Sequence, residues 1–121
     1  MTIARTVVAV VDDMFFASKI RATAEALAIE IAFPRNKELL LSGIAEKRPD
    51  LIVVDLHNQK IDALELVGQL KSMEEFASVP VLGFFSHVQM ELQRSALAAG
   101  YDQVIPRSVF SKDLAHILTG E

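Results

Sequence analysis

The segment VVAVVDDMFFASKI, residues 7–20, decides how this chain folds. Residues 7–11 are apolar and mostly β-branched, which is typical of a strand that is covered on both faces of a sheet. From residue 15 onward the segment contains good helix formers, with apolar positions spaced for one helix face. Asp12 and Asp13 stand between the two parts. The stretch therefore predicts a buried strand, an acidic turn and a helix.

The same alternation continues to the end of the chain. Strands are expected at residues 6–11, 29–33, 51–54, 79–85 and 101–106, and helices at 15–28, 36–46, 62–71, 89–99 and 111–118. Strict alternation predicts an α/β fold, a flavodoxin-like doubly wound parallel sheet of five strands with five helices. Pro106 cannot donate a ladder hydrogen bond, which favours an edge position, and the most apolar strands should be central. The strand order 2-1-3-4-5 satisfies both conditions.

The composition narrows the function and the surroundings of the protein. With 121 residues, 51% of them hydrophobic, we expect a single domain over residues 1–121. A net charge of −4 without a Lys/Arg-rich block argues against binding to nucleic acid or anionic membranes. The absence of cysteine excludes disulfides and thiolate sites. Since no segment has the pattern of a signal peptide or a membrane span, we expect a soluble, cytoplasmic protein.

Three aspartates are expected at one edge of the sheet, because Asp12 and Asp13 end the first strand and Asp55 ends the neighbouring third strand. At about 4 Å and an effective dielectric constant of about 20, each like-charge pair costs about 4 kcal/mol. Either one carboxyl is protonated or a divalent cation offsets the charge. Magnesium fits best, since it takes one or two carboxylates and then phosphate oxygens. In a simpler interpretation, Asp12 is a helix N-cap and Asp55 a solvated loop residue.

Ser86 and Arg107 follow the fourth and fifth predicted strands, so they are expected at the same edge. A hydroxyl group and a cation that face three carboxylates favour a phosphoryl group on Asp55, hydrogen-bonded by Ser86 and paired with Arg107. Each residue also has an ordinary alternative. Ser86 could cap the following helix, and Arg107 could be a surface cation.

His57 and His87 follow the third and fourth strands and are expected on loops at this edge. Together with Asp13 and Asp55 they could form a transition-metal site, since imidazole suits zinc. The two histidines are far apart in the sequence and lack a close ligand spacing. We therefore favour exposed loop positions for both.

The pattern as a whole resembles the receiver domain of bacterial two-component response regulators, the CheY-like superfamily. The resemblance covers nearly the whole chain and is carried by VVDD at 10–13, VVDL at 53–56, DALELVGQLK at 62–71, the serine of GFFS at 86 and AAG at 98–100. It implies that Asp55 is the phosphoacceptor and that Ser86 holds the phosphoryl group and reports on it. It also implies a Mg²⁺ site made by Asp12, Asp13, Asp55 and the main-chain carbonyl of His57.

Departures from the family pattern concern the readout of the site. The lysine of the family is Arg107 here, and the proline that normally follows it is Ser108. A small residue normally follows the switch hydroxyl, where this chain has His87. The aromatic residue that usually changes rotamer is Val104, and a β-branched aliphatic side chain has no comparable switch. The acidic pocket is thus intact, while the residues that report on it are altered.

Two functions remain. The first is a stand-alone receiver domain that accepts a phosphoryl group on Asp55 from a histidine kinase or phosphotransfer protein in a Mg²⁺-dependent phosphorelay. It would signal through the surface of the fourth helix, fifth strand and fifth helix, and would catalyse at most its own phosphorylation and dephosphorylation. The second is a pseudo-receiver that binds a partner, or a second copy as a homodimer, without phosphorylation. Intact Asp12, Asp13, Asp55 and Ser86 lead us to favour the first.

Overall fold

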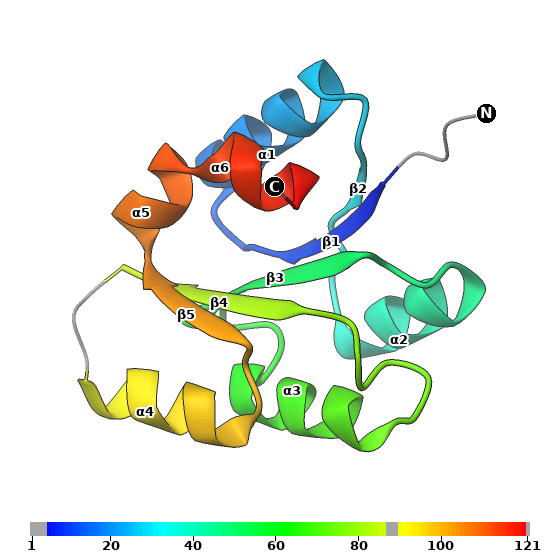
Figure 1. The fold of residues 1–121 in the computed structure, drawn as a ribbon, viewed down its shortest axis with the longest axis vertical. Coiled ribbons are helices and arrows are strands. Elements are labelled where there is room, and N and C mark those ends of the chain that lie inside the picture. The colour runs from blue at the N-terminus through cyan, green and yellow to red at the C-terminus, as the bar shows by residue number, and fades with distance from the viewer. Residues whose placement is uncertain (1–4, 87–89, 121) are drawn as a thin grey trace.

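The computed structural model describes residues 5–86 and 90–120, and within them the chain forms one five-stranded parallel sheet (Figure 1). The strands are β1 (Thr6–Val10), β2 (Glu30–Ala32), β3 (Leu51–Asp55), β4 (Val81–Phe85) and β5 (Gln103–Pro106). Their order is β2-β1-β3-β4-β5, which confirms the prediction. Because every neighbouring pair is parallel, all the carboxyl ends lie along one edge of the sheet.

Six helices lie within the described residues: α1 (Met14–Ala26), α2 (Lys37–Glu46), α3 (Ala63–Ser72), α4 (Met90–Ala99), α5 (Arg107–Lys112) and α6 (Leu114–Thr119). Helices α1, α5 and α6 cover one face of the sheet, and α2, α3 and α4 cover the other (Figure 1). None of the helices described is long and apolar enough to cross a membrane.

The prediction of one last helix that begins at Ser111 is wrong. Strand β5 leads directly into α5, so that Ser111 lies inside this helix. The helical conformation is interrupted at Asp113, and α6 begins at Leu114. The buried residues Phe110, Leu114 and Leu118 keep the four-residue spacing of one helix face across that break. The apolar pattern therefore covers both short helices and gives no sign of the break between them.

Two apolar layers result from the alternation of side chains along the strands. One layer packs Val8, Val10, Ile52 and Val54 against α2 and α3, and Val104 and Phe85 belong to it as well. The other layer packs Val7, Ala9, Val53 and Phe84 against α1, α5 and α6. The central strands are buried on both faces, as their continuous apolar sequences predict.

Local signals in the sequence set the helix ends. Asn36 caps α2 by accepting the Leu39 N–H at 2.8 Å, and Asp62 caps α3 in the same way, as expected. Helix α4 ends before Gly100, whose φ of 127° is a conformation that favours glycine.

Candidate functional site

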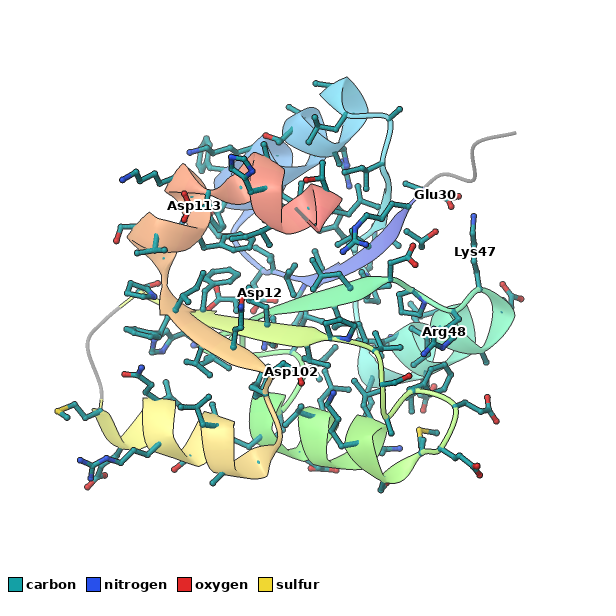
Figure 2. The ribbon with its side chains drawn as sticks, in the orientation of Figure 1. Asp12, Glu30, Lys47, Arg48, Asp102 and Asp113 are labelled. Carbon is teal, nitrogen blue, oxygen red and sulfur yellow. The ribbon has the colours of Figure 1, made fainter. Side chains whose placement is uncertain are left out.

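The sheet brings the predicted acidic residues to one edge. The register of β1 and β3 pairs Val10 with Val54, so Asp12 and Asp55 leave neighbouring strands almost side by side. Figure 2 shows Asp12 well separated from Glu30 and Lys47, which lie at the other end of the sheet.

Asp55 is the last residue of β3 and is only 8% exposed. Its Oδ1 accepts the main-chain N–H of His57 at 2.9 Å, and its main-chain oxygen accepts the N–H of Asn58 at 3.0 Å. Burial raises the pKa of Asp55, an effect that the His57 N–H and the charge of Arg107 partly oppose. The alternative of a solvated loop aspartate is therefore wrong, because Asp55 belongs to β3 and is buried.

Asp13, and not Asp12, is the N-cap of α1. Its Oδ1 accepts the N–H groups of Phe15 at 2.9 Å and Phe16 at 3.1 Å. Its Oδ2 accepts a hydrogen bond from Arg107 Nη2 at 3.1 Å. The Phe16 N–H and the Arg107 guanidinium lower the pKa of Asp13, so this carboxylate is held in its charged form.

Asp12 has a different role from the N-cap considered for it. Its Oδ2 accepts the N–H of Gln59 at 2.8 Å, which ties the end of β1 to the loop after β3. The hydrogen bond keeps the Asp12 carboxylate close to Asp55, whose pKa it raises slightly by charge repulsion.

Arg107 is the first residue of α5, and its guanidinium lies against the first turn of α1. Besides the bond to Asp13, the Arg107 Cζ lies 4.1 Å from the centre of the Phe16 ring, the geometry of a cation–π contact. Phe16 is buried, and nothing in the sequence indicated its contact with Arg107. No local spacing could have suggested it, because the contact depends on how α5 packs against α1.

Oxygen ligands of the type that magnesium prefers are present at this edge, but they are not assembled into a metal site. Among the residues described, no group of three or more His, Asp or Glu side chains is arranged to hold a metal ion. Asp13 uses one oxygen to cap α1 and the other to bind Arg107. The donors thus match Mg²⁺ in chemistry. In this arrangement an internal guanidinium supplies part of the positive charge that three carboxylates require.

Of the remaining predicted residues, Ser86 and His57 follow the carboxyl ends of β4 and β3. Ser86 directly follows β4 and is exposed, and His57 is half-buried in the loop after β3. His87, for which we favoured an exposed loop position over a role in a metal site, lies outside the described residues. Val104 is buried, and the nearby Tyr101 is fixed because its buried hydroxyl donates to the Ala63 carbonyl at 2.8 Å.

The sequence also matches a known protein family. The response regulator receiver domain family matches residues 7–119. The chain belongs to this family. As a receiver domain it is part of two-component signalling. No curated protein matches the chain.

Solved structures with the same fold are only distantly related in sequence. The phosphorylated cyanobacterial phytochrome response regulator RcpA is 19% identical with a TM-score of 0.81, over 98% of this chain and 91% of that one. The chemotaxis protein CheY4 of Vibrio cholerae is 18% identical with a TM-score of 0.80, over 96% and 100%. A response regulator from Thermotoga maritima is 17% identical with a TM-score of 0.76, over 97% and 99%. At these identities the likeness supports the fold alone.

Proposed function

We propose that this receiver domain accepts a phosphoryl group on Asp55 from a histidine kinase or a phosphotransfer protein. The observation that carries the proposal is the state of the Asp55 carboxylate. Its Oδ1 is held by the His57 N–H, while its Oδ2 accepts no hydrogen bond from residues 5–86 or 90–120. A buried carboxylate at the end of a central strand, with one oxygen oriented and the other without a hydrogen bond from the described residues, is suited to act as a nucleophile.

The reaction exchanges one bond to phosphorus for another. Asp55 Oδ2 forms the new O–P bond, and the bond between phosphorus and the donor nitrogen breaks with its electron pair leaving on that nitrogen. Because the nucleophile is the ionised carboxylate, the raised pKa of Asp55 slows the reaction at low pH. The group would be held by two residues of the edge, Ser86 through its exposed hydroxyl and Arg107 through its guanidinium.

Mg²⁺ is the cofactor that receiver domains generally use, and when bound it would neutralise charge on the transferred group. The residues that would hold it are Asp12, Asp13, Asp55 and the main-chain carbonyl of His57. In this chain Asp13 takes part only when its oxygen is released by Arg107.

The partner surface that we propose consists of α4, β5 and α5. Met90 and Leu97 on α4 are 62% and 48% exposed, and Val109 on α5 is 39% exposed. Apolar side chains that face solvent in this region support contact with a protein partner or with a second copy of the chain.

A second candidate function is a pseudo-receiver that binds its partner without phosphorylation. The bond between Arg107 and Asp13 favours it, because this pair already neutralises part of the negative charge at the edge. Both candidate functions use the same fold, so a phosphorylation experiment is needed to distinguish them.

Intact-mass analysis after incubation with acetyl phosphate and Mg²⁺ tests the proposal. We expect a gain of one phosphoryl group in the wild-type protein and none in Asp55→Asn. Asp62→Asn is the matched control, because it makes the same substitution at an aspartate whose side chain caps α3, and asparagine caps equally well. This control should be labelled like the wild type. If no adduct forms at any Mg²⁺ concentration, the pseudo-receiver function is the better one.

A further inference from the structure

The loop between β3 and α3, residues 56–62, carries backbone donors that hold two carboxylates of the acidic edge. The N–H of His57 donates to Asp55 Oδ1 at 2.9 Å, and the N–H of Gln59 donates to Asp12 Oδ2 at 2.8 Å. The orientation of both carboxylates therefore depends on where the loop places these two N–H groups.

The side chain of Asn58 folds this loop into a compact turn. Its Oδ1 accepts the N–H of Lys60 at 3.1 Å and the N–H of Ile61 at 2.8 Å. Its Nδ2 donates to the main-chain oxygen of Asp55 at 2.8 Å. An asparagine that bonds the backbone on both sides makes such a turn stiff. The position of the loop is therefore set mainly by what holds its two ends.

Tyr101 packs at both ends of the loop. Its hydroxyl donates to the carbonyl of Ala63, the first residue of α3, at 2.8 Å in a fully buried hydrogen bond. Its ring and the side chain of Leu56, the first residue of the loop, both pack over Gly83. A Cβ atom on Gly83 would lie 3.1 Å from Tyr101 Cδ1 and 2.9 Å from Leu56 Cδ2.

The end of α4 fixes Tyr101 itself. The Tyr101 N–H donates to the Ala96 carbonyl at 3.2 Å, and Gly100, with a φ of 127°, turns the chain between them. Tyr101 is only 3% exposed, and burial raises the pKa of its hydroxyl. The hydroxyl therefore stays protonated at neutral pH and remains a hydrogen-bond donor.

We infer that Tyr101 is a positioning residue for Asp55, because its hydroxyl and its ring hold the loop after β3 at both ends. The inference rests on the proposed function, since it concerns the residue that we propose as the nucleophile. A tyrosine that only filled the core would contribute to stability without affecting the hydrogen bonds of the loop. The two roles therefore predict different results.

Tyr101→Phe tests the inference in the protein without a phosphodonor, because it keeps the ring and removes the hydrogen bond of the hydroxyl. In nuclear magnetic resonance measurements, we expect the N–H groups of His57 and Gln59 to exchange about two- to tenfold faster than in the wild type. This is the range that corresponds to the loss of one hydrogen bond. The Asp55 carboxyl should titrate at a higher pH, since a less firmly held His57 N–H stabilises the charged form less.

Ile44→Val is the matched control. Ile44 is buried in α2 beside residues of β1 and β2, and loss of its methylene group should cost about as much stability as loss of one hydrogen bond. Exchange at His57 and Gln59 and the titration of Asp55 should stay as in the wild type. The inference is overturned if Tyr101→Phe also leaves them unchanged, or if the control changes them to the same extent.

Labelling with acetyl phosphate and Mg²⁺ separates this inference from the proposed function. We expect the adduct to form about two- to tenfold more slowly in Tyr101→Phe than in the wild type, because the nucleophile is less well oriented. A wild-type protein that is never labelled, although Tyr101→Phe loosens the His57 N–H, contradicts only the phosphoacceptor function. Equal rates of labelling in Tyr101→Phe and the wild type contradict only the positioning role.

Discussion

Asp13 and Asp55 carry the same side chain, yet their surroundings shift their pKa values in opposite directions. Hydrogen bonds from Phe16 and Arg107 stabilise the charged form of Asp13 and lower its pKa. Burial disfavours the charged form of Asp55 and raises its pKa. As the pH falls, Asp55 is protonated first. The edge therefore loses its proposed nucleophile while the cap of α1 is still intact.

Replacing Asp55 with asparagine should stabilise the protein at neutral pH. The folded state holds the Asp55 proton more tightly than the unfolded chain, so stability falls as the pH rises through the raised pKa. Asparagine keeps an oxygen for the His57 N–H and carries no charge. In calorimetric scans we expect a higher Tm for Asp55→Asn at pH 7, with a difference that shrinks as the pH falls toward the ordinary aspartate value of 3.8.

For Asp13→Asn we expect the opposite change in stability. Asparagine still caps a helix but cannot pair with Arg107, so this variant should be less stable than wild type at pH 7. The loss should disappear as the pH falls through the lowered pKa of Asp13. If both variants respond to pH alike, the assignment of the two environments is wrong.

Strand β4 is shaped by a residue that lacks a side chain. A Cβ atom on Gly83 would lie 2.9 Å from Leu56 Cδ2 and 3.1 Å from Tyr101 Cδ1. Leu56 and Tyr101 are both buried, and they close over the strand at this point. Leu56 directly follows Asp55, so the packing on Gly83 helps to fix the position of the buried carboxylate.

Gly83→Ala should destabilise the protein by about 1–2 kcal/mol, because the added methyl group must push apart two buried side chains. Gly68→Ala is the matched control in α3, where a Cβ atom would meet nothing within 4 Å. This control should gain about 0.5–1 kcal/mol from its higher helix propensity. Urea unfolding measures both changes. A neutral Gly83→Ala would mean that Leu56 and Tyr101 move aside freely.

At the scale of the whole molecule, the two apolar layers share one sheet. Tyr101 belongs to the layer beneath α3 and α4, whereas Phe110 belongs to the layer beneath α1 and α6. Since every strand of the centre contributes side chains to both layers, we expect the two to unfold together.

Phe110→Ala tests this coupling, because the chain has a single tyrosine and no tryptophan. Loss of the buried ring should cost about 3–5 kcal/mol. The urea midpoint should fall equally when followed by circular dichroism and by Tyr101 fluorescence from the opposite layer. Phe15→Ala removes a ring that is 91% exposed and should change stability by less than about 0.5 kcal/mol. A tyrosine transition that stays at the wild-type midpoint would show two independent layers.

Sequence patterns predicted the sheet because strand burial and strand order are reflected in local sequence. Continuous apolar runs marked the central strands, and Pro106 marked an edge. The candidate site was harder to predict. Neighbouring aspartates look equally suited to cap α1, and only the backbone geometry selects Asp13. The contact of Arg107 with Phe16 depends on how α5 packs against α1, which no local pattern encodes.

Both margins of the sheet discourage sheet growth between molecules. Strand β2 has only three residues, and β5 ends in Pro106, which has no N–H to offer to an incoming strand. The edges of the sheet therefore offer few backbone groups that could pair with a strand of a second copy. For this reason we expect any self-association to use helical surfaces and not the edges of the sheet.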